Sequence, residues 1–304
     1  MKGVFFMVGP TATGKSELTA DVAHKVGAEI VSADAFQIYR GLNLLTAKPD
    51  ASILEKVPHH LLGTCSLSEE MNAETFRGEA NNAIQSIQAR EKRAIVVGGS
   101  GLYIKALTHG LSSLPAADVE LRRQLNDLST DELGARLSQF DPDMATRIDL
   151  KNRRRLIRAV EICLLTGQPV AAQRNTWHSP KSDEGADSPA GVFVFRERDD
   201  LYRRINQRVE RMFEQGVIDE VRGITETSAT AAKTLGLSEL RALLDGRISR
   251  AQCVEAIQQS TRRYAKRQLT WFRHQTNFEP LNLSLLSHVE AVAWIAERVL
   301  SLSR

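Results

Sequence analysis

A lysine, a serine and two glycines near the start of the chain have the spacing of a phosphate-binding loop. Residues 9–16 read GPTATGKS, which fits the pattern of a glycine, four residues and then Gly-Lys-Ser or Gly-Lys-Thr. In such loops backbone N–H groups surround phosphate oxygens, the lysine adds positive charge, and the hydroxyl can bind Mg²⁺. The sequence predicts that a diphosphate or triphosphate is held by Gly9, Thr11, Ala12, Thr13, Gly14, Lys15 and Ser16, with Ser16 as the ligand of Mg²⁺.

Asp34 is the acidic residue that we expect beside this loop. The apolar run 4–8 before the loop predicts a buried parallel strand, and apolar residues after it recur at helical spacing. Residues 29–34 predict a second strand that delivers Asp34 to the carboxyl edge of the sheet, where open α/β folds bind ligands. The next strand, 94–97, is followed by Gly98, Gly99 and Ser100, with no acid. The alternative is that Asp34 is only a helix cap or a turn residue.

Further motifs follow the loop along the chain. They read SADAFQIYRG (32–41), TAKP (46–49), PHHL (58–61), VGGSGLY (97–103) and KRQLTWFR (266–273). In this order, and with the phosphate loop, they cover nearly the whole chain and resemble the tRNA dimethylallyltransferase family. The resemblance implies transfer of a dimethylallyl group from dimethylallyl diphosphate to the exocyclic amine of the adenine beside the anticodon. It also implies a parallel sheet of the P-loop NTPase type flanked by helices, with an all-helical insertion.

Functional residues are carried over from the resemblance one by one. Asp34 is the expected general base, and Ser100 is expected to help Asp34 orient the adenine amine. Arg208 is expected to bind the diphosphate, and the alternative is that it is only a surface arginine. Trp271 is a packing or stacking residue, with packing favoured. The expected tRNA contacts are Asp34, Ala35, Phe36, Gln37, Tyr39, Ser100, Arg122, Arg154, Arg155, Arg158, Lys266, Arg267, Gln268 and Arg273.

Five positions depart from the family pattern. Ser100 stands where threonine is usual, which keeps the hydroxyl group. Asn43 and Leu45 replace Asp and Gly, and Gly63 replaces an Asp after the histidine pair. Leu237 replaces a tyrosine, which weakens any tRNA contact expected there.

The charge of the chain is unevenly distributed. The net charge is +3, yet residues 151–158 and 262–273 each carry five basic residues and no acid, so these two stretches sum to +10 and the remainder to −7. A charged run is often only a solvated helix face, but two uncompensated runs indicate a polyanionic partner such as the tRNA anticodon stem-loop.

Location and assembly follow from what the sequence contains. No apolar run is long enough to cross a bilayer or to act as a secretory signal. Cys65, Cys163 and Cys253 have neither disulfide nor zinc spacing. We therefore expect a cytoplasmic monomer without a membrane partner. The pair His59 and His60 does not predict a metal site, because adjacent side chains on a strand point apart.

Apolar periodicity divides the chain into two predicted domains. An α/β core comprises 1–112 and 190–304, and a helical insertion that contacts tRNA comprises 113–189. The core is predicted to contain strands 94–97 and 192–195 and then helices alone. We expect a loop at 175–189. The predicted helices are 73–90, one beginning at 102–107, several within 118–166, a single helix over 201–222, and 237–244, 250–273 and 287–302.

Three other functions compete with tRNA prenylation. Adenylate dimethylallyltransferase would run the same chemistry on free AMP or ATP, but it needs no extended basic patch. A P-loop kinase for a small molecule needs a second Mg²⁺-binding carboxylate, which is missing after 94–97. A non-catalytic RNA-binding protein would not need to keep Lys15, Ser16 and Asp34.

Overall fold

The chain forms two compact units. The computed structural model describes residues 3–111, 114–173 and 189–302. Unit 1 comprises Met1–Thr108 and Asp183–Arg304, and unit 2 comprises His109–Ser182. The residues 175–189 that we expected to form a loop lie outside the described residues, except for Pro189.

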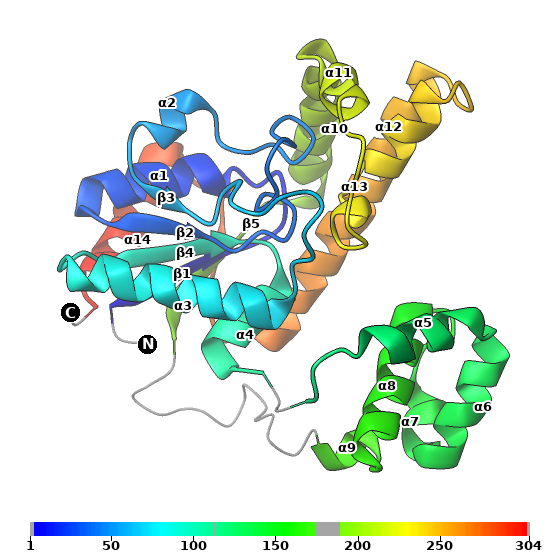
Figure 1. Cartoon of the computed structure of the whole chain (residues 1–304). Helices are drawn as coiled ribbons and strands as arrows, with labels where there is room; N and C mark the ends of the chain where they lie inside the picture. Colours follow the sequence, from blue (N-terminus) through cyan, green and yellow to red (C-terminus); the bar gives the residue numbers. More distant parts are fainter. Residues whose placement is uncertain (1–2, 112–113, 174–188, 303–304) are drawn as a thin grey trace. The chain divides into compact units, whose positions relative to one another are not determined.

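A six-stranded sheet forms the centre of unit 1 (Figure 1). All pairings are parallel, and the strand order is β3-β2-β4-β1-β5-β6. The strands are β1 (Val4–Val8), β2 (Glu29–Ser32), β3 (His59–His60), β4 (Ala94–Gly98), β5 (Ala190–Phe195) and β6 (Glu279–Asn282). Because β1 and β4 pair in register from Val4–Ala94 to Val8–Gly98, the segments that follow them leave the same edge of the sheet. The predicted α/β class is confirmed.

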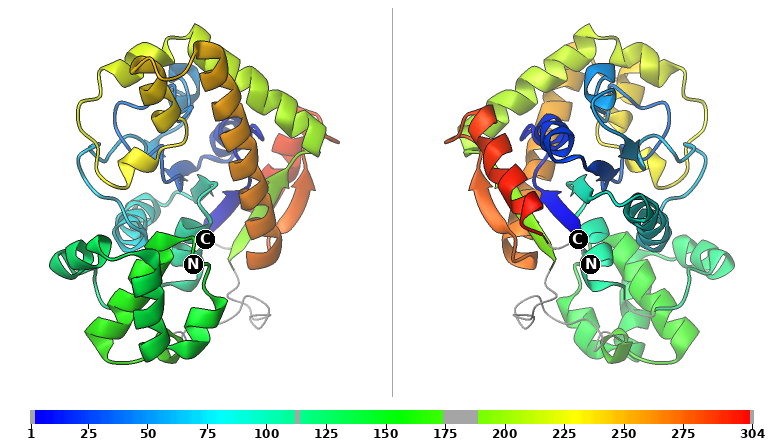
Figure 2. Two further views of the ribbon diagram at one scale, coloured as in Figure 1. Left: turned by 90° about the vertical axis from the view of Figure 1, so that its right-hand side faces the viewer. Right: turned by 90° about the vertical axis from the view of Figure 1, so that its left-hand side faces the viewer.

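Helices cover both faces of this sheet. Helix α1 (Lys15–Val26) and helix α14 (His288–Leu300) pack side by side on one face (Figure 2). Helix α3 (Ala73–Ala89) covers the other face. The buried strand β1 serves both layers, since Phe5 and Met7 join the core with α1 and α14 while Phe6 joins the core with α3.

Four further helices build a helical layer beyond the sheet. They are α10 (Arg198–Glu214), α11 (Val217–Arg222), α12 (Leu237–Leu244) and α13 (Arg250–Gln275). They share an apolar cluster that includes Val209, Leu240 and Ile257 and also holds Leu42 and Leu45 from the segment after β2. The short elements of this unit are α2 (Ala51–Leu54), α4 (Gly101–His109) and a 3₁₀ helix (Ala231–Lys233).

Unit 2 contains only helices among its described residues. They are α5 (Val119–Asp127), α6 (Thr130–Phe140), α7 (Pro142–Arg147), α8 (Arg153–Thr166) and α9 (Val170–Gln173). Their common core includes Leu125, Leu137 and Leu156. Asp141 caps α7 by accepting a hydrogen bond from the N–H of Met144, as its position before Pro142 predicts.

Two predictions about the second half of the chain were wrong. The single helix expected over 201–222 is two helices, α10 and α11, because Gly216 between them adopts a left-handed conformation with φ of 93°. The region predicted to be only helical also contains β6 at the edge of the sheet. Its sequence includes Glu279 and Pro280, and proline is tolerated at such an edge.

Candidate active site

The phosphate loop lies between the end of β1 and the start of α1. Gly9 must be a glycine because a Cβ there would lie 2.1 Å from the carbonyl oxygen of Val194. Gly14 has φ of 92°, in the left-handed region that favours glycine, and caps α1. The loop therefore opens into a helix N-terminus, the position where backbone N–H groups and the helix dipole favour anions.

Lys15 is buried within its own loop. Its side chain is 9% exposed, and Nζ donates a hydrogen bond to the carbonyl oxygen of Pro10 at 2.9 Å. Burial lowers the pKa of Lys15 to about 8, with the nearby charge of Asp34 raising it and that of Arg208 lowering it. A bound anion would stabilise the charged form and raise this pKa again.

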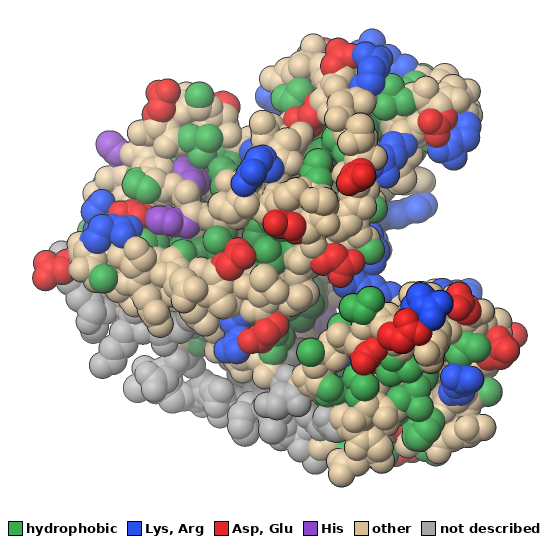
Figure 3. Space-filling model, viewed as in Figure 1, with side chains coloured by type: hydrophobic (Ala, Val, Ile, Leu, Met, Phe, Trp, Pro, Cys, Tyr) green, Lys and Arg blue, Asp and Glu red, His purple; other side chains and the backbone are tan. Residues whose placement is uncertain are grey.

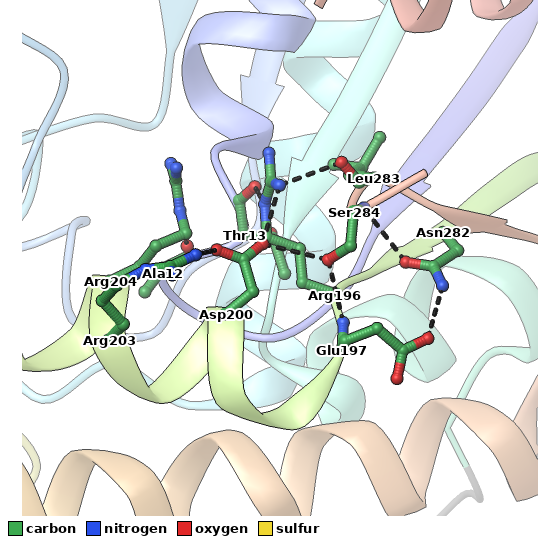
Figure 4. Close-up of polar contacts among 10 residues, drawn as sticks. All are labelled: Ala12, Thr13, Arg196, Glu197, Asp200, Arg203, Arg204, Asn282, Leu283 and Ser284. Atoms are coloured by element: carbon green, nitrogen blue, oxygen red, sulfur yellow. Dashed lines mark hydrogen bonds and ion pairs between the residues drawn. The ribbon is translucent and has the colours of Figure 1, made fainter. Parts of the chain in front are cut away.

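Three arginines contact the loop: Arg196, which directly follows β5, and Arg204 and Arg208 of α10. Arg208 donates to Oγ1 of Thr11 at 2.8 Å and to the carbonyl oxygen of Thr46 at 3.3 Å. Arg204 and Arg196 donate from Nε to the carbonyl oxygens of Ala12 at 2.9 Å and Thr13 at 2.8 Å (Figure 4). Arg204 and Arg196 therefore fix the loop through its carbonyl oxygens, and Arg208 fixes it through the hydroxyl group of Thr11.

Asp200 anchors Arg196 in turn. It accepts hydrogen bonds from Arg196 at 3.0 Å, from Arg203 at 2.7 Å and from Ser284 at 2.9 Å (Figure 4). Burial would raise the pKa of Asp200, but the hydrogen bonds from Arg203, Ser284 and Arg196 lower it to about 2. Asp200 is therefore ionised at neutral pH and holds Arg196 against the loop.

Arg196 and Arg204 were not predicted from the sequence to hold the phosphate loop. Two signals were present: Arg196 directly follows a predicted strand, and Arg204 lies four residues before Arg208 on one helix. Residues four apart share a helix face, so a loop contact at Arg208 makes one at Arg204 geometrically reasonable.

Asp34 lies two residues beyond β2, and its carboxylate is part of a tight turn. Its Oδ1 accepts hydrogen bonds from the N–H groups of Phe36 at 2.9 Å and Gln37 at 3.3 Å. The hydroxyl of Ser100 accepts a hydrogen bond from the N–H of Ala35 at 2.8 Å. The two predicted catalytic residues thus meet at the carboxyl edge of the sheet.

A cavity of about 1020 Å³ lies over the phosphate loop in unit 1. Lys15, Ser16, Asp34 and Arg208 all line it, together with Lys48. The structure therefore places most of the predicted diphosphate-binding residues and the predicted base in one cavity, whereas Gly9 and Thr13 are buried and do not line it. Such a volume reaches the upper end of the range for small-molecule sites, roughly 300–1000 Å³.

The residues around Ser16 fit a Mg²⁺ ion that is coordinated mainly by water and by the phosphate oxygens of a bound substrate. Within the described part of the chain, no three His, Cys, Asp or Glu residues form a group that could hold a metal ion. Mg²⁺ keeps several waters and is commonly bound through one or two protein groups plus substrate phosphates. The hydroxyl of Ser16, half-buried at the start of α1, suits that mode.

Two predicted tRNA contacts lie in the interior. Tyr39 is 1% exposed, and its hydroxyl is hydrogen-bonded to Oγ1 of Thr230 at 2.7 Å. Gln268 is 5% exposed and hydrogen-bonded on both sides of its amide. Tyr39 and Gln268 could reach tRNA only if this packing opened, so we correct their assignment to structural roles. Gln37 is half-buried and donates to the carbonyl oxygens of Thr46 and Ala47.

Of the remaining predicted contacts of unit 1, Ser100 is buried at 7% exposed, whereas the others are at least partly accessible. Lys266, Arg267 and Arg273 are exposed on α13, and Phe36 is half-buried with Ala35 beside the turn of Asp34. Lys and Arg side chains gather along the edge of unit 1 that α12 and α13 form (Figure 3).

In unit 2, the predicted basic contacts differ in their environment. Arg154 and Arg155 are exposed on α8. Arg122 and Arg158 instead pair with the buried carboxylate of Glu161 at 2.9 and 2.5 Å. The Arg122 guanidinium therefore joins α5 to α8, while Arg158 pairs with Glu161 within α8, and a tRNA contact by either arginine stays a prediction.

The two adjacent histidines have separate structural contacts. His59 Nδ1 lies 2.8 Å from the carbonyl oxygen of Val57, and His60 Nε2 lies 2.8 Å from Glu29. Both side chains therefore have polar structural roles. Trp271 packs against Gly101 and contacts Phe272 edge-on, so its expected packing role is confirmed.

Comparisons with known proteins agree with this geometry. A family model described as IPP transferase matches residues 37–275. The tRNA dimethylallyltransferase 1 of Citrifermentans bemidjiense is 45% identical over 278 residues, 88% of each chain. The tRNA dimethylallyltransferase of Akkermansia muciniphila is 39% identical over 295 residues, 97% of each chain.

Solved structures show the same relationship. The tRNA isopentenylpyrophosphate transferase of Bacillus halodurans is 33% identical with a TM-score of 0.70, covering 98% of this chain and 97% of its own. A eukaryotic dimethylallyltransferase acting on tRNA has a TM-score of 0.73 at 25% identity, covering 92% of this chain and 73% of its own. In the described residues, no helix is long and apolar enough to span a membrane.

Proposed function

This chain belongs to the IPP transferase family, and the relatives described above are tRNA dimethylallyltransferases. We propose that it transfers a dimethylallyl group to tRNA. The donor is dimethylallyl diphosphate, and the acceptor is the N6 amine of the adenosine next to the anticodon. The products are N6-isopentenyladenosine in tRNA and diphosphate. The comparisons favour tRNA over free AMP or ATP as the acceptor.

One observation carries this proposal: a phosphate loop and a carboxylate line the same cavity. Lys15 and Arg208 are close enough to Asp34 for its charge to raise the pKa of both side chains, although burial lowers the pKa of each overall. A diphosphate at the loop and an amine at Asp34 would therefore lie within the same cavity. That is the arrangement a displacement at an allylic carbon requires.

Asp34 has the position of the general base. The adenine nitrogen N6 attacks the primary carbon of the donor, a C–N bond forms, and the C–O bond to the diphosphate breaks with its electron pair leaving on oxygen. The proton lost by N6 goes to the carboxylate of Asp34. The turn through Phe36 and Gln37 holds this carboxylate in place, and Ser100 holds the turn. A base of this kind contributes about 10²–10⁴-fold in rate.

The loop stabilises the leaving group. Lys15 and Arg208 would neutralise the charge that develops on the departing diphosphate, and the loop N–H groups would donate hydrogen bonds to it. When bound through Ser16, Mg²⁺ would supply additional positive charge on the same oxygens.

The acceptor needs a surface for the anticodon stem-loop. Exposed Lys266, Arg267 and Arg273 on α13, and Arg154 and Arg155 on α8, are suited to bind phosphates. The target adenine must leave its stack before it can reach Asp34. A cytoplasmic location and a monomeric state remain predictions.

The test is mass spectrometry of nucleosides from tRNA incubated with the protein and dimethylallyl diphosphate. We expect N6-isopentenyladenosine with the wild type. Asp34→Asn should lower single-turnover transfer by about 10²–10⁴-fold while stem-loop affinity stays within a few-fold. Asp245→Asn, which removes an exposed carboxylate paired with Arg247, is the charge-matched control. Near-normal turnover in Asp34→Asn would remove Asp34 as the base.

A further inference from the structure

The buried amide of Gln268 joins the phosphate loop to the turn after β4. Its Oε1 accepts a hydrogen bond from the N–H of Thr11 at 2.9 Å, and its Nε2 donates to the carbonyl oxygen of Gly99 at 2.8 Å. Thr11 belongs to the phosphate loop, and Gly99 directly precedes Ser100. One side chain of α13 therefore fixes two segments of the site that are far apart in the sequence.

The close approach of α13 depends on two glycines in that turn. A Cβ on Gly99 would lie 2.2 Å from Nε2 of Gln268, and a Cβ on Gly101 would lie 2.4 Å from the ring of Trp271. A side chain at either position would therefore force the Gln268 amide or the Trp271 ring to move. An amide supplies a donor and an acceptor on one planar group, which matches the two opposed contacts of Gln268.

A second residue of α13 reaches the turn that carries the base. The ring of Tyr264, one turn before Gln268, lies 6.0 Å from that of Phe36, whose N–H binds the carboxylate of Asp34. Burial raises the pKa of the Tyr264 hydroxyl, and hydrogen bonding with Ser100 and Gln268 partly offsets that rise. The same face of α13 thus contacts the phosphate loop, the turn after β4 and the turn that carries Asp34.

Lys266 and Arg267 directly precede the buried Gln268 in the sequence, and both are exposed to solvent on this helix. If RNA phosphates bind there, as the proposed function holds, they restrain the helix that positions the N–H of Thr11. We propose that Gln268 is a positioning residue that couples diphosphate binding to tRNA binding through α13. Coupling of this kind is reciprocal, so each ligand should tighten the other by the same factor.

Two glutamine substitutions on α13 separate coupling from simple stability. Gln268→Met removes both hydrogen bonds at similar size. Gln258→Met is the matched control. The Gln258 amide joins α13 to Asn206 and Glu210 of α10, and not to the phosphate loop, the turn after β4 or the turn of Asp34. The measurement is the calorimetric affinity for inorganic pyrophosphate with Mg²⁺, without and with a saturating anticodon stem-loop.

We expect the stem-loop to tighten pyrophosphate binding at least about fivefold in the wild type and in Gln258→Met. In Gln268→Met the two affinities should agree within twofold. An unchanged ratio in Gln268→Met, even with a lowered melting temperature, would reduce Gln268 to a structural role and overturn the inference. Absence of coupling in the wild type would overturn it as well. These are binding measurements, so failure of the proposed transfer would appear separately, as unmodified tRNA.

Discussion

At the scale of single residues, the buried ammonium group of Lys15 links phosphate binding to pH. Burial lowers its pKa to about 8, so the folded protein holds this proton less tightly than the unfolded chain does. Between that value and the ordinary lysine pKa, the unfolded chain binds more protons, and stability rises with pH. An anion at the loop reverses the preference because it stabilises the charged form.

Pyrophosphate affinity should therefore fall as pH rises above about 8. One pH unit above its pKa, only about a tenth of Lys15 is protonated, so affinity can fall by up to about tenfold per unit. Calorimetric titrations between pH 7 and pH 10 would measure this. Arg208 should stay protonated throughout and preserve part of the binding.

Lys15→Arg is the control for this pH dependence, because a guanidinium group stays charged over the same range. Its affinity should change less with pH. Lys48 lines the same cavity, and burial lowers its pKa to about 8 as well. Any slope left in Lys15→Arg is therefore assigned to Lys48, and an equal slope in both proteins would contradict the role of Lys15.

At the scale of secondary structure, a buried carboxylate joins α5 to α8 in unit 2. Glu161 on α8 is fully buried and accepts hydrogen bonds from Arg122 of α5, from Arg158, and from the N–H of Asp118 at 3.0 Å. Burial would raise the pKa of Glu161, but these hydrogen bonds lower it overall. Its stabilising effect is therefore present above the ordinary glutamate pKa and lost as pH falls.

Glu161→Gln should lower the free energy of unfolding by about 2 kcal/mol, less than for a fully buried pair because both arginines are partly exposed. Urea unfolding of the full chain at pH 7 would measure the loss, which should shrink below about pH 4. Glu120→Gln, which breaks an exposed pair with Arg123, should change stability little. Equal losses in the two variants would contradict the anchoring role.

Most elements could be predicted because their signals are local. The apolar run of β1, the glycine–lysine spacing of the loop and the helical periodicity of α3 each lie within one short window of sequence. Strand β6 could not be predicted, because it is short and begins with Glu279 and Pro280. It is stabilised by pairing with β5, which is distant in the sequence. The break at Gly216 looked like one glycine within a continuous apolar pattern.

At the scale of the whole molecule, the site combines local motifs with long-range contacts. Asp34 and the loop were predictable because a strand end fixes the direction of the chain. Gln268 was not predicted to hold the loop, since its bond to Thr11 spans 257 residues and its neighbours Lys266 and Arg267 suggested an exposed position. Arg122 and Arg158 show the same limit: their charge was visible in the sequence, but their partner Glu161 was not.

The charge pattern along the chain provides the test of the RNA partner. A stem-loop presents many phosphates to a basic surface, whereas free AMP presents one. Each protein cation that neutralises a phosphate releases about one counterion and adds about one unit to the slope of log affinity against log salt. A tRNA enzyme should therefore show steep salt dependence, which an enzyme for free adenylate would lack.

Lys266→Ala/Arg267→Ala should lower stem-loop affinity and reduce that slope by about two units. Fluorescence anisotropy with a labelled anticodon stem-loop across a salt series would measure both. Affinity for dimethylallyl diphosphate in the absence of RNA should barely change, because neither side chain lines the cavity over the phosphate loop. Lys25→Ala/Lys56→Ala removes the same charge outside the predicted tRNA contacts and should keep the wild-type slope. A flat salt dependence in the wild type, or AMP modified as readily as the stem-loop, would contradict a tRNA substrate and favour the adenylate enzyme.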